Sequence, residues 1–236
     1  MSPRKSPDRT PGQQQWLRVL QAAVDSQKII SGAVAVGGTA AALYAGHRLS
    51  VDTDHLLSNL NDRFDEVREQ LETVPQWSTT RVHPPVLILG SLEGVEIGFR
   101  QSRRSLPIET AFKDTPSGKL CVPTLDELIG MKAYLAYSRR ATRDFLDFAA
   151  LSALVEKDEV LATLLRSQAR YGELQSGSVA LEIAKTLSDP EPFDLDSVDL
   201  GTYKGIQPPW NDWDRVAAQC RMYGTQFGET LMRQSE

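Results

Sequence analysis

The sequence is poor in cysteine and has no long apolar run, and these absences exclude several classes of protein. Cys121 and Cys220 are the only cysteines in 236 residues, and neither has metal-ligating neighbours. A disulfide framework and a zinc knuckle are therefore not expected, which fits a reducing compartment such as the cytoplasm. Every apolar stretch falls short of the roughly 18 residues that a membrane helix needs, so no membrane contact is expected.

The sequence also lacks an excess of basic residues. Lys and Arg number 26 against 31 Asp and Glu, which gives a net charge of −5. Without a global positive field, contact with nucleic acid must come from local basic clusters, each of which is equally compatible with a solvated surface. The clusters are Arg100, Arg103 and Arg104, and then Arg139, Arg140 and Arg143.

Three regions differ in composition. Residues 1–12 are polar and proline-rich without the apolar core of a signal peptide, so they are expected to form a disordered tail. Short β-compatible segments separated by Pro and Gly occur in 13–122, whereas 123–236 has helical periodicity almost throughout. We therefore expect an α/β lobe over 13–122 and a helical lobe over 123–236 that completes a shared cleft.

Periodicity and capping residues predict the individual elements. Thr124 and Glu127 form a capping-box pattern, Thr142 is expected to cap the next helix, and Gly46 is expected to end an early one. Helices are predicted at 13–28, 39–45, 58–73, 124–137, 143–156, 158–170, 176–187 and 211–233. Strands are predicted at 29–36, 49–54, 77–82, 86–89, 95–99 and 108–112, and 188–210 as a long surface connection.

A glycine pair and two aspartates stand close together near the start of the chain. Gly37-Gly38-Thr39 opens a short helix, and Asp52-x-Asp54 follows it. Glycine allows a close approach to phosphate, and a helix start favours anions. Alternate strand residues share a face, so the two carboxylates would hold hard cations side by side. Either feature alone is usually structural, but their combination favours a site for phosphate and metal.

The run from Val36 to Asp54 resembles the first motif of the AbiEii/AbiGii-type nucleotidyltransferases, toxins within the DNA polymerase β-like superfamily. The resemblance continues in Leu125-Asp-Glu-Leu-Ile-Gly-Met-Lys-Ala-Tyr and in Arg139-Arg-Ala-Thr-Arg-Asp-Phe-Leu-Asp-Phe. It implies an α+β fold, with a small mixed sheet in the N-terminal lobe and a mainly helical C-terminal lobe. It also implies a nucleoside triphosphate substrate with Mg²⁺ or Mn²⁺, and a toxin of a toxin–antitoxin or phage-defence system. In some relatives tRNA 3′ ends are the acceptor, and a cognate antitoxin protein is the expected partner.

The same resemblance suggests roles for residues that the pattern alone leaves open. Lys132 lies in an apolar helix, where a lysine either extends to solvent or contacts a triphosphate. Asp144 and Asp147 share a helical face, although an acid in a first turn is also stabilised by the helix dipole. The catalytic set implied is Asp52, Asp54, Lys132, Asp144 and Asp147. The nucleotide-binding set is Gly37, Gly38, Thr39, Arg48, Ser50 and Lys132, with Asp52, Asp54 and Glu96 as metal ligands.

One position departs from the superfamily pattern. A third carboxylate is expected on a neighbouring strand, but the corresponding stretch is Val95-Glu-Ile-Gly-Phe, and Gly98 stands where the acid would be. Glu96 shares a strand face with Gly98, so it either substitutes or is an ordinary surface residue. His47, His55 and His83 lack metal-ligand spacing and are given no catalytic role.

The leading hypothesis from the sequence is therefore a metal-dependent enzyme that transfers a nucleoside monophosphate to an acceptor. Two alternatives remain open. The acceptor could be a small molecule or a protein hydroxyl in place of tRNA, or the protein could be a non-catalytic member that binds nucleotide as a regulator. The doubtful third carboxylate keeps the second alternative open.

Overall fold

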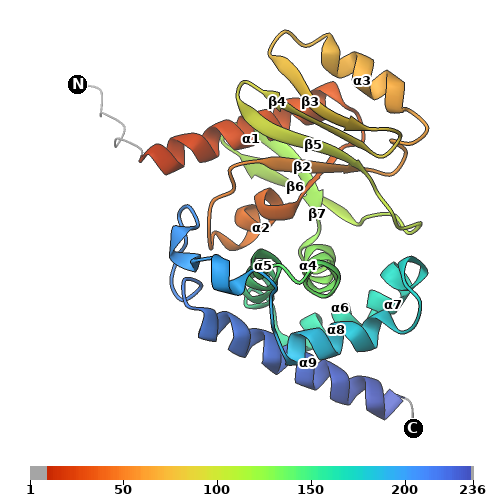
Figure 1. Cartoon of the computed structure of the whole chain (residues 1–236), viewed down its shortest axis with the longest axis vertical. Helices are drawn as coiled ribbons and strands as arrows, with labels where there is room; N and C mark the ends of the chain where they lie inside the picture. Colours follow the sequence, from red (N-terminus) through yellow and green to blue (C-terminus); the bar gives the residue numbers. More distant parts are fainter. Residues whose placement is uncertain (1–9, 235–236) are drawn as a thin grey trace.

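A mixed sheet lies over a bundle of helices in the computed structural model, which describes residues 10–234 (Figure 1). The predicted α+β fold with a small mixed sheet and a helical second half is confirmed. The strands are β1 Val34–Val36, β2 Thr53–Leu57, β3 Trp77–His83, β4 Leu87–Leu92, β5 Val95–Gln101, β6 Thr110–Thr115 and β7 Gly118–Pro123. The helices are α1 Pro11–Ile29, α2 Gly37–Ala45, α3 Phe64–Glu72, α4 Leu125–Arg139, α5 Thr142–Ser152, α6 Lys157–Leu165, α7 Ser167–Tyr171, α8 Val179–Ser188 and α9 Trp213–Gln234.

The strand order in the main sheet is β1-β2-β5-β4-β3. Only β2 and β5 run parallel; the other neighbouring pairs are antiparallel. In this register Asp54 of β2 pairs with Val36 on one side and with Gly98 of β5 on the other. The loop that carries Asp52 therefore leads into β2, which lies between β1 and β5 in the sheet.

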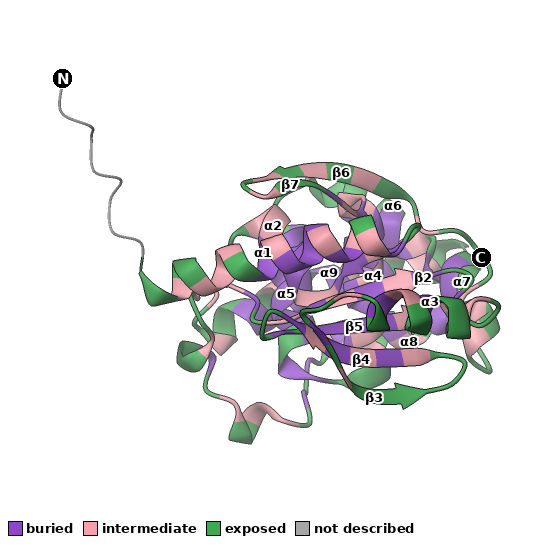
Figure 2. Cartoon of the chain, turned by 90° about the horizontal axis from the view of Figure 1, so that it is seen from above, coloured by how far each residue is buried: buried purple, intermediate pink, exposed green. Residues whose placement is uncertain are grey.

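Two clusters of buried apolar side chains hold the fold together. One joins the main sheet to α1 and α3 and includes Phe64, Ile97 and Phe99. The other fills the helical half, and it also takes in β7 and α2. Figure 2 shows the contrast between the buried residues of α5 and the exposed outer strand β3. Because β7 and α2 pack with the helices, the two halves share a core, and the boundary predicted at residue 123 stays a prediction.

Several predicted elements are placed differently in the structure. The strand predicted over 29–36 is wrong in its first part, because α1 continues to Ile29 and a turn at Gly32 (φ 80°) precedes β1. The helix over 58–73 begins only at Phe64, and β7 was not predicted. Thr10 caps α1 and residues 11–12 form its first turn, so that part of the predicted tail is helical. The rest of the tail, residues 1–9, lies outside the described residues.

The helix caps at the junction of the two halves also differ from the prediction. Gly46 (φ 59°) ends α2 as predicted. The Thr124 hydroxyl accepts a hydrogen bond from the Glu127 amide, but the Glu127 carboxylate binds Arg104 and does not complete a capping box. Thr142 does not cap α5 with its own side chain. Asp194 does so instead, 52 residues away, by accepting from the Thr142 amide at 2.8 Å and its hydroxyl at 2.7 Å.

Candidate active site

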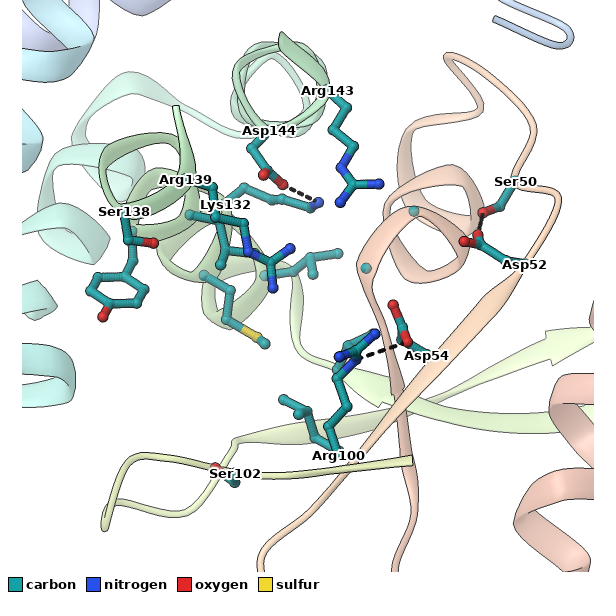
Figure 3. A pocket seen from close by; sticks show the side chains of 18 of the residues that line it. Ser50, Asp52, Asp54, Arg100, Ser102, Lys132, Ser138, Arg139, Arg143 and Asp144 are labelled. Atoms are coloured by element: carbon teal, nitrogen blue, oxygen red, sulfur yellow. Dashed lines mark hydrogen bonds and ion pairs between the residues drawn. The ribbon is translucent and has the colours of Figure 1, made fainter. Parts of the chain in front are cut away.

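A cavity of about 940 Å³ lies between the main sheet and the helical half. Figure 3 shows Asp52 and Asp54 on one side of it and the α4 residues Lys132, Ser138 and Arg139 on the other. Its charged lining is strongly cationic although the chain as a whole is acidic: eight Lys and Arg side chains face three aspartates. The cations are Arg48, Arg100, Arg103, Arg104, Lys132, Arg139, Arg143 and Lys204; the acids are Asp52, Asp54 and Asp144.

The glycine pair at the start of α2 lines this cavity. Gly37 has a φ of 67°, which a residue with a side chain adopts only at a cost. A Cβ on Gly38 would lie 2.8 Å from an Arg48 nitrogen and 2.9 Å from the Ser50 hydroxyl. Both glycines are thus required by the local geometry, and the absence of side chains leaves the N-terminus of α2 open to the cavity.

Thr39, Ser50 and the two predicted metal ligands form one connected group. The buried Thr39 hydroxyl donates a 2.7 Å hydrogen bond to the Asp52 carbonyl, so its side chain positions the loop and does not face the cavity. Ser50 donates to Asp52 Oδ1 at 3.0 Å. Asp52 precedes β2, which begins at Thr53, so the strand predicted over 49–54 is wrong except for its last two residues. Both carboxylates nevertheless line the cavity.

Gly98 faces Asp54 across the β2–β5 pair, where a third carboxylate was sought. A Cβ at Gly98 would lie 2.3 Å from Asp54 Oδ1, so no larger residue fits without moving Asp54. Arg100, two residues further along β5 and on the same face, donates from Nε to the same oxygen at 3.0 Å. Glu96 is exposed, and the structure does not bring it to the cavity lined by the two aspartates. Within residues 10–234, no group of three His, Cys, Asp or Glu side chains is arranged to hold a metal ion.

Asp147 is the centre of a buried network on α5. Its carboxylate accepts from Arg48 at 2.8 and 2.9 Å, lies 2.8 Å from His47 Nε2, and pairs with Lys132 Nζ at 2.8 Å. Lys132 also donates to Asp144 at 2.9 Å. Lys132 and Asp144 line the cavity and are almost completely buried, whereas Asp147 lies behind them. The structure therefore brings the predicted residues together, with Asp147 holding the cations and not facing the cavity.

The charges in this network stabilise one another. Burial raises the pKa of Asp147, but Arg48 and Lys132 more than offset this and hold it well below its ordinary value of 3.8. Burial likewise lowers the pKa of Lys132, while Asp147 and Asp144 raise it above its ordinary value. Lys132 is therefore a permanent cation at neutral pH. Arg48, whose guanidinium also lies 5.7 Å from the centre of the Tyr203 ring, is held charged in the same way.

Sequence reasoning missed the contribution of the connection between α8 and α9. It was predicted as a surface segment, yet Thr202, Tyr203 and Lys204 line the cavity. Its backbone is hydrogen-bonded to the loop that carries the active-site residues: the Lys204 carbonyl accepts from Leu49, and Gln207 donates to the His47 carbonyl. These pairs span more than 150 residues, and no local pattern in the sequence indicates them.

Comparison with known proteins identifies the family. The sequence model of a family described as "Nucleotidyl transferase AbiEii toxin, Type IV TA system" matches residues 31–232. The chain belongs to the AbiEii family. A crystal structure of an H. pylori protein assigned as a nucleotidyltransferase superposes with a TM-score of 0.54 at 14% identity, over 96% of this chain and 99% of that one. The solution structure of the antibiotic-resistance factor ANT(2″)-Ia gives 0.50 at 11% identity, over 68% and 95%. These likenesses show that the AbiEii chain has a nucleotidyltransferase fold.

A curated relative shares sequence with this AbiEii chain over a limited stretch. The "Mycolic acid-containing lipids exporter MmpL11" of Mycolicibacterium smegmatis is 30% identical over 159 residues. The match spans 62% of this chain but only 16% of that protein. Among the described helices of the AbiEii chain, none combines the length and apolarity needed to cross a membrane.

The cavity suits a divalent cation that arrives with a triphosphate. Mg²⁺ is commonly held by one or two carboxylates, with phosphate oxygens and water completing its shell. Asp52 and Asp54 supply two carboxylates at the cavity wall, and the cationic lining suits the phosphates. The carboxylates are not buried, so they need no resident cation to neutralise them. The donor set therefore fits Mg²⁺ bound together with its nucleotide.

Proposed function

We propose that this AbiEii-family protein transfers a nucleoside monophosphate from a nucleoside triphosphate to a hydroxyl acceptor, with Mg²⁺ or Mn²⁺ as the cofactor. The observation that carries the proposal is the positive charge of the cavity in a chain of net charge −5: eight cations line it with three aspartates, and they still outnumber the acids when Asp147 and Glu127, which pair with three of these cations from behind the wall, are included. Such a lining favours a polyphosphate, and Asp52 and Asp54 supply the carboxylates that a divalent cation bound with it would use.

Each part of the cavity has a role in this proposal. The open N-terminus of α2 at Gly37 and Gly38 offers amide donors to phosphate oxygens. Arg48 and Lys132, fixed by Asp147, present positive charge that needs no reorganisation during the reaction. Asp52 and Asp54 would hold the divalent cation, which supplies charge neutralisation of the triphosphate when bound. Ser50 orients Asp52 through its hydroxyl.

The proposed reaction exchanges one phosphorus–oxygen bond for another. The acceptor oxygen bonds to the α-phosphorus as the bond to the pyrophosphate oxygen breaks, pyrophosphate leaves, and the hydroxyl proton passes to solvent. Gly98 removes the carboxylate that would otherwise take this proton beside Asp54. Asp144 and Asp147 act through Lys132 and are positioning residues. Glu96 has no part in the proposal because it does not line the cavity.

We further propose that the acceptor is the 3′ end of an RNA such as tRNA, and that the protein is a toxin neutralised by a cognate antitoxin. The family description supports the toxin role. Exposed arginines at the cavity, Arg103, Arg139 and Arg143, support a polyanionic acceptor. A small-molecule or protein hydroxyl is the alternative acceptor.

The test is incubation of the protein with Mg²⁺, each labelled nucleoside triphosphate and total tRNA. Label is expected in the RNA, and Asp52→Asn and Asp54→Asn are expected to lower its transfer by roughly 100-fold or more. Asp62→Asn, an exposed residue outside the cavity lining, is the matched control. Label in the protein or small-molecule fraction would indicate another acceptor. Undiminished transfer by both active-site variants would overturn the catalytic proposal.

The toxin role has its own measurement. Expression of the wild-type chain is expected to arrest growth of a bacterial host, and expression of Asp52→Asn is not. Equal arrest by both chains would show that toxicity does not depend on transfer.

A further inference from the structure

The end of the cavity opposite the two aspartates is apolar and aromatic. One face of α4 lines it with residues at helical spacing, and α7 and the turn after it close it. In Figure 3, Ser138 marks this side and Asp52 the other. The residues at this end are Met131, Tyr134, Leu135, Tyr171, Leu174 and Gln175. The proposed reaction, which takes place at Asp52 and Asp54, does not use them.

The aromatic rings at this end form a rigid platform. Tyr134 and Tyr171 are stacked, with ring centroids 4.3 Å apart and planes only 10° from parallel. Tyr171 is buried, and Arg104 lies over its ring at 5.5 Å while donating to the buried Glu127 at 2.6 Å. Tyr134 is only half-buried and lines the cavity. A ring fixed in this way offers a flat surface for another planar group at little entropic cost.

Three arginines that line the same cavity have no carboxylate partner within the described part of the chain. Arg103, Arg139 and Arg143 are exposed at the cavity, and among residues 10–234 no carboxylate lies within ion-pair distance of any of them. Arg48 and Lys132, by contrast, are paired with Asp147 in the buried network. These three arginines are positive charges beyond those of the paired network, and Arg139 lies one turn after Leu135 on α4, beside the aromatic end. An occupant that brings phosphates as well as a ring matches both features.

We propose that Tyr134, supported by Tyr171, is the subsite for the terminal nucleobase of a single-stranded polynucleotide acceptor, with Arg103 and Arg139 at its phosphates. The proposal rests on the proposed transferase function and adds which residues hold the acceptor. The exposed Gln175, whose amide lies 3.5 Å from the Tyr134 hydroxyl, is a polar group beside the platform that can contact a base edge. The stacked base places the terminal ribose toward the aspartates.

The test measures equilibrium binding of two short single-stranded RNAs that differ only in the last nucleotide, which is intact in one and abasic in the other. The wild-type protein is expected to bind the intact RNA about tenfold more tightly or better, because stacking on an aromatic ring has this strength. Tyr134→Leu is expected to abolish that preference, and Tyr134→Phe to retain it. Tyr137→Leu is the matched control, since Tyr137 contacts Tyr134 edge-on from the same helix but does not line the cavity.

A second measurement excludes the donor nucleotide as the occupant. Binding of each nucleoside triphosphate is compared with binding of inorganic triphosphate, in the wild type and in Tyr134→Leu. The difference in affinity between a nucleoside triphosphate and inorganic triphosphate is expected to be the same in the wild type and in Tyr134→Leu. A base-dependent loss of nucleotide affinity in Tyr134→Leu, or equal binding of intact and abasic RNA by the wild type, would overturn it.

The arginines are tested by salt dependence. Arg103→Ala and Arg139→Ala are each expected to lower the slope of log affinity against log salt by about 0.7, and Arg68→Ala, on the distant helix α3, is expected to leave it unchanged. Unchanged slopes in both cavity variants would contradict the phosphate contacts. Base-dependent RNA binding without any nucleotide transfer would refute the proposed function and leave the subsite intact, so the two failures are distinguishable.

Discussion

Gly98 lies directly opposite Asp54, and the space where its Cβ would be is 2.3 Å from Asp54 Oδ1. The absence of a carboxylate at position 98 therefore goes together with the position of the Asp54 side chain. Asp54 leans over β5 into the room that the glycine leaves. An acid at position 98 would displace Asp54 and would not add to it.

This relationship predicts that Gly98→Ala lowers nucleotide transfer by roughly 100-fold while the fold is retained, because a shift of about 1 Å in a reacting group has such an effect. The measurement is the transfer rate from a labelled nucleoside triphosphate, with circular dichroism to check the fold. Glu96→Gln, two residues away on the same strand, is expected to retain full activity. Loss of activity in Glu96→Gln alone would restore Glu96 as a metal ligand.

The buried network predicts a different result for Asp147→Asn. This change leaves Arg48 and Lys132 without their shared partner in a buried site, which costs about 3–5 kcal/mol of unfolding free energy. Urea denaturation measures it. Asp52→Asn, at the cavity wall, is expected to lose activity with little change in stability. Equal stability of the two variants would contradict the role of Asp147 as the centre of the network.

The burial of His55 predicts that the stability of the fold depends on pH. Its ring is completely buried and stacked on Phe99 at 5.3 Å, and burial lowers its pKa from 6.5 to about 4. The unfolded chain takes up a proton below pH 6.5 before the folded one does, so stability falls as the pH falls from 6.5 toward 4. The slope is about 1.4 kcal/mol per pH unit.

Denaturation midpoints between pH 6.5 and 5 test this, a range that lies above the titration of Asp147. His55→Gln is expected to flatten the profile there, and His83→Gln, which is exposed on β3, is not. An unchanged slope in His55→Gln would assign the dependence to other groups.

The hydrogen bonds from Thr142 to Asp194 predict that Asp194 stabilises the start of α5. Asp194→Ala removes both hydrogen bonds to Thr142 and is expected to cost about 1 kcal/mol, the usual value for an N-cap. Thermal denaturation measures the change. Asp196→Ala, exposed two residues later, serves as the control. A larger loss in Asp196→Ala would show that the segment itself, and not the cap, determines stability.

The sequence predicted the parts of this fold that depend on neighbouring residues. The apolar spacing of α4 and α9, the stop at Gly46 and the β-strands separated by Pro and Gly are local patterns, and the structure bears them out within a few residues. The strand predicted over 29–36 is right for Val34–Val36 and wrong before them, because α1 continues to Ile29 and a turn at Gly32 separates it from β1. The cap that Asp194 provides could not be predicted, because its partner Thr142 is 52 residues away in the sequence.

The candidate site likewise contains residues that local motifs predicted and residues that only the folded chain brings together. Asp52, Asp54, Lys132 and Asp144 were found from motifs and do line one cavity. The partners that give Asp147 its place, His47 and Arg48, stand 100 and 99 residues from it and follow no spacing rule. Tyr203 and Lys204 come from a segment with no helical or strand pattern, so only folding brings them to the cavity.

The contact between residues 203–207 and the loop at 47–49 has a consequence for how the protein is made. One wall of the cavity, and the hydrogen bonds that brace the loop before Asp52, come from the last fifth of the chain. A ribosome releases that stretch after the sheet and α4 have already emerged. The cavity is therefore finished last during synthesis, and a nascent chain that has folded its sheet still lacks the wall that encloses its substrate.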